Sequence, residues 1–248
     1  MIEIKNIHKA FGDHQVINGV TAEFHPGITN LIIGGSGSGK TVLLKCMVGL
    51  HEPDQGNVLY NGRDFTRMNF EERIAIRKEI GMLFQGSALF DSMTVEENIL
   101  FPLNMFTNQS AAEKLERANF CLERVNLAGK NHLYPSELSG GMKKRVGIAR
   151  AIAMNPKYLF CDEPNSGLDP RTSIVIDELI AEITDEYQIT TIVVTHDMNS
   201  VMGIGEKILY LHQGKKWWEG SNEEILSATN KELNDFIFAS KFMKALKK

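Results

Sequence analysis

The sequence contains no apolar run of the ~18 to 20 residues that a membrane-spanning helix requires. Its N-terminus also lacks the charged and then apolar pattern of a secretion signal, so we expect a cytoplasmic protein. The three cysteines, Cys46, Cys121 and Cys161, lie far apart among apolar neighbours, which favours buried thiols over disulfides or metal ligands. Basic residues are not in excess, and the net charge of -4 argues against nucleic acid as a partner.

Apolar residues, by contrast, make up 43% of the 248 positions, enough for a packed core in one large domain or two small ones. Residues 34–41 match the phosphate-binding loop pattern G-x-x-x-x-G-K-S/T at every fixed position. The glycines let successive N–H groups turn toward phosphate oxygens, a lysine adds positive charge, and the threonine hydroxyl suits Mg2+. The predicted nucleotide-binding residues are therefore Gly34, Gly35, Ser36, Gly37, Ser38, Gly39, Lys40 and Thr41.

A flexible Gly/Ser turn is the alternative interpretation of this loop. The flanking sequence argues against it, because an apolar strand is expected at 28–33 and an apolar helix at 42–50. Strand, loop and helix then follow in the order that the motif needs.

Three other strands are followed by polar side chains. Gln85 follows an apolar strand expected at 80–84, Asp162 and Glu163 follow one ending at Cys161, and His196 follows a β-branched strand. Buried carboxylates are costly unless a cation or a reaction uses them, so Asp162 suits Mg2+ and Glu163 suits an attacking water. Without further context, Gln85 is typical of a solvated residue and His196 of a capping or packed histidine.

A second glycine pair occurs at 138–142, where Leu-Ser-Gly-Gly-Met precedes a run of strong helix formers. Ser139, Gly140 and Gly141 at a helix N-terminus would form a second anion-binding site. An ordinary N-cap explains the same residues almost as well, and this stretch leaves both interpretations open.

Residues 86–106 are rich in apolar side chains that we expect to be exposed, and such a patch indicates a docking surface. A charged amphipathic helix is expected at 108–124, with Ser110 and Glu113 at capping-box spacing. We expect residues 87–155 to form a helical insertion into an α/β core.

At the two ends of the chain the patterns are less specific. Residues 2–24 alternate in polarity around a turn, which predicts an antiparallel strand pair. Phe11 near that turn either stacks on an adenine base or fills the core, and the pattern itself favours the core. Residues 231–248 are amphipathic and suit a subunit latch first, with a membrane-surface helix or a plain terminal helix as alternatives.

In order and on the expected elements, these motifs resemble the ATP-binding subunit of ABC transporters over nearly the whole chain. The matching motifs are Walker A at 34–41, the Q-loop glutamine Gln85, the family signature at 138–142, Walker B with the catalytic glutamate at 158–163, the D-loop at 166–169, and the switch histidine His196. Phe11 falls where the family places an adenine-stacking aromatic, which reverses the preference stated above. Met142 replaces the glutamine that many members carry at the last signature position.

The resemblance implies an α/β fold: a P-loop NTPase (RecA-like) core, an N-terminal antiparallel β subdomain and an inserted α-helical signature subdomain. Within this single ABC ATPase domain, the core is expected at 1–86 and 156–226, the helical subdomain at 87–155, and a helical tail at 227–248.

The resemblance also implies ATP and Mg2+ as cofactors and a head-to-tail homodimer. Each ATP would lie between the 34–41 loop of one subunit and Ser139, Gly140 and Gly141 of the other. The implied catalytic residues are Lys40, Gln85, Glu163 and His196, the implied metal ligands are Thr41, Gln85 and Asp162, and Phe11 and Asp169 join the nucleotide-binding residues.

A narrower resemblance, to the ATPase of the Mla (MCE-associated) phospholipid transporters, depends on residues 81–103 and on Leu-Ser-Gly-Gly-Met. It implies phospholipid transport between bacterial membranes, with an integral-membrane permease docking near Leu89 to Phe106. It also implies an MCE-domain lipid-binding protein in the same complex and a peripheral location on the cytoplasmic face of the inner membrane.

Three alternatives stay open at this point. An ABC ATPase for another cargo, such as an amino acid or a drug, fits nearly as well, because membrane subunits choose the cargo. An ABC-type ATPase acting on nucleic acid or ribosomes usually has two cassettes or a long coiled-coil insertion, and neither is evident. A P-loop kinase has no evident use for the second glycine pair.

Overall fold

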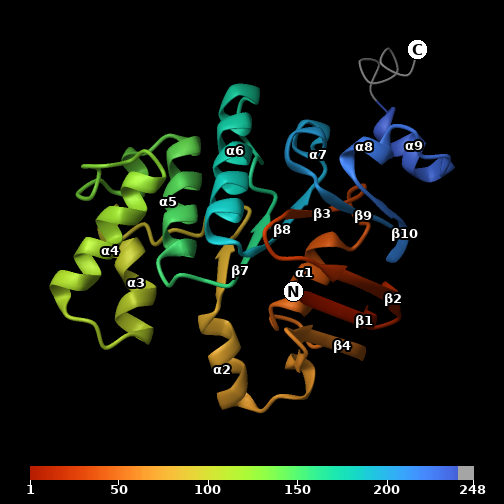
Figure 1. Cartoon of the computed structure of the whole chain (residues 1–248), viewed down its shortest axis with the longest axis horizontal. Coiled ribbons are helices and arrows are strands. Elements are labelled where there is room, and N and C mark those ends of the chain that lie inside the picture. The colour runs from red at the N-terminus through yellow and green to blue at the C-terminus, as the bar shows by residue number, and fades with distance from the viewer. Residues whose placement is uncertain (240–248) are drawn as a thin grey trace.

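The larger of two β-sheets forms the centre of the molecule (Figure 1). The computed structural model describes residues 1–239. The six strands lie in the order β10 (Lys215–Gly220), β9 (Lys207–His212), β3 (Thr29–Ile33), β8 (Thr190–Thr195), β7 (Tyr158–Asp162) and β6 (Ile80–Leu83). All neighbours pair in parallel except β10, which is antiparallel to β9. Every residue of β3, β7 and β8 is buried, as expected for parallel strands covered on both faces.

The smaller sheet is antiparallel and confirms the strand pair predicted at the N-terminus. Its strands lie in the order β2 (His14–Phe24), β1 (Ile2–Phe11), β4 (Gln55–Tyr60) and β5 (Arg63–Asp64). The turn between β4 and β5 is Asn61-Gly62, and both residues have positive φ, 49° and 76°. Those values suit the tight turn that the Asn-Gly pair predicts.

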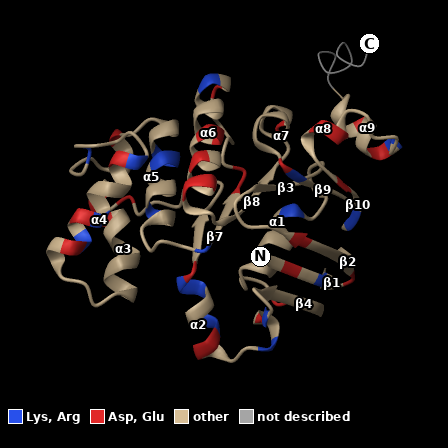
Figure 2. Ribbon diagram, viewed as in Figure 1, with Lys and Arg blue, Asp and Glu red and all other residues tan. Residues whose placement is uncertain are grey.

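Helices surround these sheets, and α3, α4 and α5 gather at the left of Figure 1, away from the smaller sheet. The helices are α1 (Lys40–Met47), α2 (Phe70–Lys78), α3 (Val95–Phe106), α4 (Ala111–Arg124), α5 (Gly140–Ile152), α6 (Pro170–Tyr187), α7 (Met198–Ile204), α8 (Asn222–Ile225) and α9 (Lys231–Ile237), with short 3-10 turns at Phe65–Arg67 and Pro135–Glu137. Figure 2 shows charges of both signs along α2, α4 and α6. Within the described residues, no helix is both long and apolar enough to cross a membrane.

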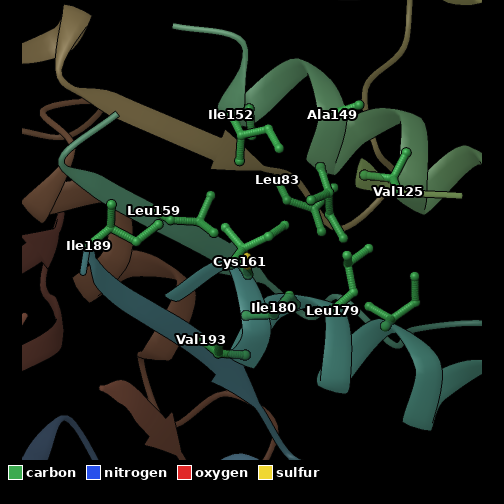
Figure 3. Close-up of a cluster of buried hydrophobic side chains, with 14 of the residues drawn as sticks. Leu83, Val125, Ala149, Ile152, Leu159, Cys161, Leu179, Ile180, Ile189 and Val193 are labelled. Atoms are coloured by element: carbon green, nitrogen blue, oxygen red, sulfur yellow. The ribbon is translucent and has the colours of Figure 1, made fainter. Parts of the chain in front are cut away.

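The apolar interior is divided into two clusters. One fills the space between the two sheets and includes α1. The other lies between the larger sheet and the helices, where Leu159 and Cys161 of β7 meet Ile180 of α6 and Ile152 of α5 (Figure 3). All three cysteines are buried and free, as the sequence predicts.

Several sequence predictions need correction at their boundaries. The sequence pattern predicts a helix over residues 174–186, but α6 begins at Pro170, because the carboxylate of Asp169 accepts hydrogen bonds from the N–H groups of Arg171 and Thr172, both at 3.1 Å. Helix α4 begins at Ala111 instead of residue 108, because Ser110 is its N-cap and forms the predicted capping box with Glu113.

The expected exposed patch at 86–106 is only partly exposed. Ile99 and Leu103 are 0% and 2% exposed, since they lie four residues apart on the face of α3 that packs into the core. Phe90, Met105 and Phe106 remain exposed.

The expected helix at the C-terminal end begins with α9. Leu233 and Ile237 of α9 are buried in the larger apolar cluster of the same chain. The apolar face of α9 is therefore occupied within the molecule, and residues 240–248, which complete the amphipathic stretch, lie outside the described residues.

A buried polar cluster joins the chain after β7 to two helices. The side-chain amide of Asn165 donates to the carboxylate of Asp177 on α6 at 2.8 Å and to the hydroxyl of Ser200 on α7 at 3.0 Å. Asp177 is 5% exposed, and burial raises the pKa of its carboxyl to about 6.

Truncation of a core side chain tests the packing. We expect Leu159→Ala to destabilise the protein by about 2 to 5 kcal/mol, because it removes buried methyl groups and leaves a cavity in β7. Chemical denaturation measures the difference. Leu115→Ala on α4, where the side chain is 40% exposed, is the control and should cost under about 1 kcal/mol. Equal losses in both variants would contradict the assigned burial.

The Asp177 cluster predicts a pH effect. The folded-state pKa of Asp177, about 6, exceeds its ordinary value of 3.8, so the folded chain holds this proton more tightly than the unfolded chain. Stability from this group is therefore present at low pH and is lost as pH rises from about 4 to about 6. Asp177→Asn should remove that loss. The unfolding temperature of the variant should therefore exceed that of the original chain by more at pH 7 than at pH 4.

The exposed Asp185 at the end of α6 provides the control, because Asp185→Asn removes a charge from the same helix. Thermal denaturation at several pH values compares each variant with the original chain. The prediction is wrong if the stability of Asp177→Asn follows pH in the same way as the unaltered protein.

Candidate functional site

A polar cleft of about 1090 Å3 opens where the central parallel strands end. Open parallel sheets commonly bind ligands at this edge. The loop before α1, the segment after β6, the segment after β7 and the residue after β8 all reach it. The predicted site residues that line the cleft are Gly35, Ser36, Gly37, Lys40, Thr41, Gln85, Glu163 and His196.

The loop before α1 has the backbone that a phosphate-binding loop needs. Gly34 has φ 154°, and a Cβ at this position would lie 2.2 Å from the carbonyl oxygen of Leu211. Helix α1 has no side-chain cap, whereas α2, α3 and α4 each have a capping box. The free N–H groups at the start of α1 are therefore available to an anion.

Two side chains of this loop are buried with unusual partners. The ammonium of Lys40, 8% exposed, donates to the carbonyl oxygens of Gly34 at 2.9 Å and Gly35 at 3.1 Å. Burial lowers the pKa of Lys40, and the carboxyls of Glu163 and Asp162 oppose that shift. The buried hydroxyl of Ser38 has no hydrogen-bond partner within residues 1–239. A buried donor without a partner and an ammonium held only by carbonyls both fit a bound phosphate.

Asp162 and Thr41 fit a magnesium ion. Thr41 Oγ1 donates to Asp162 Oδ1 at 3.1 Å, and burial raises the pKa of the Asp162 carboxyl. A cation beside Asp162 would relieve the cost of keeping this buried carboxyl ionised. The described residues contain no cluster of three or more His, Cys, Asp or Glu side chains suited to a metal. Mg2+ needs no such cluster, because one or two carboxylates plus phosphate oxygens and water usually hold it.

Glu163 and His196 face one another at the rim of the cleft. His196 Nδ1 lies 2.9 Å from the carboxylate of Glu163. The backbone of Glu163 is left-handed, with φ 48°, and its N–H donates to the carbonyl of Val194 at 2.8 Å. Because the strand next to β7 fixes the Glu163 backbone, the carboxylate is directed into the cleft instead of the core.

Other predicted residues lie outside this cleft. Ser139 caps α5 by accepting from the N–H of Met142 at 3.3 Å, which is the ordinary N-cap interpretation. A Cβ on Gly141 would lie 2.5 Å from Thr172 Cγ2, so this glycine lets α5 approach α6. Gly140 is exposed beside it, and Asp169 caps α6.

Phe11 also lies outside the cleft. Its ring is 47% exposed, with the Lys9 ammonium 5.4 Å from the ring centroid and the His51 ring edge-on at 5.3 Å. The position is therefore not the core position that the strand pattern favours.

Sequence reasoning missed Lys144. This side chain is 4% exposed and donates to the backbone carbonyls of Gln85 and Glu163. Its position was the available signal: Lys144 is three residues after Gly141 and four before Ile148, on the buried face of α5. Ser166, within hydrogen-bond reach of Gln85 at 3.4 Å, was assigned only to a loop motif.

Comparison with known proteins agrees with this geometry. The profile of the family described as ABC transporter matches residues 17–166. The methionine import ATP-binding protein MetN of Campylobacter jejuni is 39% identical over 98% of this chain and 77% of its own length. The probable ribonucleotide transport ATP-binding protein mkl of Mycobacterium leprae is 34% identical over 95% of this chain and 68% of its own.

Solved structures give the same result. The bacterial ABC transporter cassette MJ0796, solved as a dimer, is 33% identical, with a TM-score of 0.82 over 90% of this chain and 99% of that one. The same cassette has been solved in a post-hydrolysis state bound to ADP and Pi. Together with the matched profile, these relatives show that the chain belongs to the ABC transporter family, as an ATP-binding subunit that uses Mg2+ and hydrolyses ATP.

Proposed function

We propose that this chain hydrolyses ATP as one half of a homodimer and thereby drives transport through an integral-membrane permease. The observation that carries the proposal is the convergence of a phosphate-binding loop, a partly buried Thr41–Asp162 pair and the Glu163–His196 pair on one cleft. These are the groups that phosphoryl transfer to water requires.

The phosphate side of the site follows from the loop. Residues 34–41 hold the phosphates through backbone N–H groups, through the ammonium of Lys40 and through the hydroxyl of Ser38. Thr41, Asp162 and Gln85 would hold Mg2+, which when bound neutralises charge on the phosphate oxygens. Lys40 exchanges its carbonyl partners for phosphate oxygens when ATP binds.

The water side follows from Glu163 and His196. Glu163 accepts a proton from the attacking water, and the imidazole 2.9 Å away orients the Glu163 carboxylate. His196 is exposed enough to meet the terminal phosphate from the same side. Gln85 lines the cleft in the segment that follows β6, and its side-chain amide lies 3.4 Å from the hydroxyl oxygen of Ser166.

The proposed dimer accounts for the site residues that lie outside the cleft. Ser139 and Gly140 at the start of α5 and Asp169 at the start of α6 are exposed, and Gly141 is buried beside them, so a second copy could present these helix starts to ATP. Helix N-termini of two copies would then face the phosphates from opposite sides. Phe11 is exposed, and its ring is free to contact an adenine base.

We place the permease contact in residues 89–106, within the proposed helical subdomain at 87–155. Phe90, Met105 and Phe106 are 40%, 59% and 41% exposed there. The ring centroid of Phe90 lies 4.7 Å from that of Phe101 on α3, the helix that ends with Met105 and Phe106, and exposed apolar side chains gathered on one element favour a protein partner. This contact would hold the ATPase at the cytoplasmic face of the inner membrane.

For the cargo, the first candidate is a small solute such as an amino acid. The relative at 39% identity is a methionine import ATP-binding protein, and this similarity supports the candidate. The relative at 34% identity has a ribonucleotide cargo in its name, so cassettes of comparable similarity serve different cargoes. The residues that bind ATP do not choose the cargo.

Phospholipid is the second candidate, carried by an MCE-domain lipid-binding protein in the same complex. The resemblance of residues 81–103 to Mla ATPases favours it. This segment includes Phe90 and most of α3, the part of the chain proposed to contact the permease. Similarity there bears on the identity of the partner more directly than similarity in the phosphate-binding loop.

Glu163→Gln tests the catalytic role. We expect turnover to fall by about 10²- to 10⁴-fold, because the amide keeps the shape of the side chain but cannot accept the proton. ATP binding should persist, and the variant should accumulate as an ATP-bound dimer. Steady-state hydrolysis, calorimetry and size-exclusion chromatography with ATP provide the measurements. Turnover close to that of the original chain would remove Glu163 from the mechanism.

Phe90→Glu tests the docking surface. The backbone of Phe90 is held by Asn98, which accepts from its N–H at 2.8 Å and donates to its carbonyl at 3.1 Å, so the loop should keep its shape. We expect the tagged variant to lose its permease during purification from native membranes while its own ATPase activity survives. Leu115→Glu, at an exposed position on α4, is the control.

The same purification separates the cargo candidates. A copurifying MCE-domain protein with bound phospholipid would support the second candidate, and a solute-binding protein would support the first. Retention of the permease by Phe90→Glu would place the contact elsewhere.

A further inference from the structure

One face of helix α5 is attached to the segment that follows β6. Lys144, Gly147 and Arg150 are spaced three residues apart on α5, and all three contact residues 83–88. The same face also contacts the segment that follows β7, where Lys144 bonds to Glu163. Two strands of the central sheet are thus joined to α5 just beyond their carboxyl ends, beside the ATP cleft.

Lys144 makes the central contact. Its ammonium donates to the carbonyl oxygen of Gln85 and, at 3.3 Å, to the carbonyl oxygen of Glu163. Both acceptors are backbone atoms of residues that line the cleft. Burial lowers the pKa of Lys144, although the nearby carboxyls of Asp162 and Glu163 oppose the shift. A charge kept at such a buried position normally has a specific use.

The contacts on either side of Lys144 show that this face fits closely. A Cβ on Gly147 would lie 2.7 Å from Leu83 Cδ1, so a larger residue here would require the Leu83 side chain to shift. The guanidinium of Arg150 donates to the carbonyls of Ser87 and Ala88, both at 2.7 Å. Ser87 and Ala88 have positive φ, 62° and 47°, and the arginine stabilises this strained turn.

The strain at Glu163 shows what Lys144 does. A non-glycine residue with φ 48° costs of order 1 kcal/mol or more and persists only where its surroundings hold it. The Glu163 N–H is held by Val194, and its carbonyl accepts from Ser166 N at 3.1 Å and from Lys144. Of these three, Lys144 also donates to the backbone carbonyl of Gln85, whereas Ser166 accepts only from the Gln85 side chain, at 3.4 Å.

We propose that Lys144 is a positioning residue, which fixes the backbones of Gln85 and Glu163 relative to each other and to the glycine-rich start of α5. This inference rests on the proposed catalytic role of Glu163. It means that a movement of α5 displaces the Gln85 and Glu163 side chains together. A displacement of catalytic groups by about 1 Å is enough to cost ~10²-fold in rate.

The test is Lys144→Met, which keeps the unbranched stem and removes the donors. We expect kcat for ATP hydrolysis to fall by about 10- to 100-fold, while KM for ATP changes by less than about threefold. The split arises because Lys144 does not contact the phosphate-binding loop. Lys143→Met, on the same turn but only half-buried, is the matched control and should leave both constants unchanged.

Combination with Glu163→Gln separates positioning from general damage. Because Lys144 acts in part through Glu163, Lys144→Met should lower the residual rate of Glu163→Gln by a clearly smaller factor, about threefold or more below its effect in the original chain. Lys144→Arg, which keeps charged donors, should retain at least about 10-fold more turnover than Lys144→Met, and it serves as the test if Lys144→Met does not fold.

Three results would overturn the inference. They are an unchanged kcat in Lys144→Met, a full additional loss in the Glu163→Gln background, and equal loss in the methionine and arginine variants. If Glu163→Gln hydrolyses ATP normally, the proposed role of Glu163 fails and the inference fails with it. If Glu163→Gln is inactive and Lys144→Met is fully active, only the role of Lys144 is wrong.

Discussion

The cost of burying charge at the carboxyl ends of the central strands is the constraint on which this structure depends. Lys40, Lys144 and Asp162 are each less than 9% exposed. Burial lowers the pKa of both lysines and raises that of the aspartate, so it favours the neutral form of each group. None of these charges has an ion-pair partner within residues 1–239. The lysines bond to carbonyl oxygens and the aspartate to a hydroxyl. A bound nucleotide with its metal supplies the missing opposite charges at Lys40 and Asp162.

The two buried lysines differ in the carbonyl oxygens to which they donate. Lys40 is bonded to carbonyls of its own loop, and these are bonds that it can exchange for phosphate oxygens. Lys144 is bonded to carbonyls of two separate segments, each next to a different strand of the sheet. The first arrangement suits a binding group, and the second suits a fixed joint between a helix and the sheet. Both depend on carbonyls of residues that follow parallel strands of the sheet.

Much of this site could be predicted from the sequence, because its parts are local. Residues 34–41 adopt the predicted loop, and Gln85, Glu163 and His196 follow the predicted strands into one cleft. Interactions between distant residues could not be predicted in the same way. Lys144 acts on Glu163 across 19 positions and on Gln85 across 59, and no periodicity in the chain connects them. The burial of Ile99 and Leu103 was also missed, because it depends on where α3 packs.

The contrast between local motifs and interactions that depend on other molecules or distant residues also explains why the sequence identifies the ATPase but not its cargo. The phosphate-binding residues must satisfy the chemistry of ATP, which is the same for every cargo, so they resemble relatives whose names differ in cargo. The exposed side chains of Phe90, Met105 and Phe106 have no such common ligand. The guanidinium carbon of Arg150, on the same helix as Lys144, lies 6.0 Å from the centroid of the Phe90 ring. Helix α5 therefore contacts the exposed Phe90 through Arg150 and the backbones of Gln85 and Glu163 through Lys144.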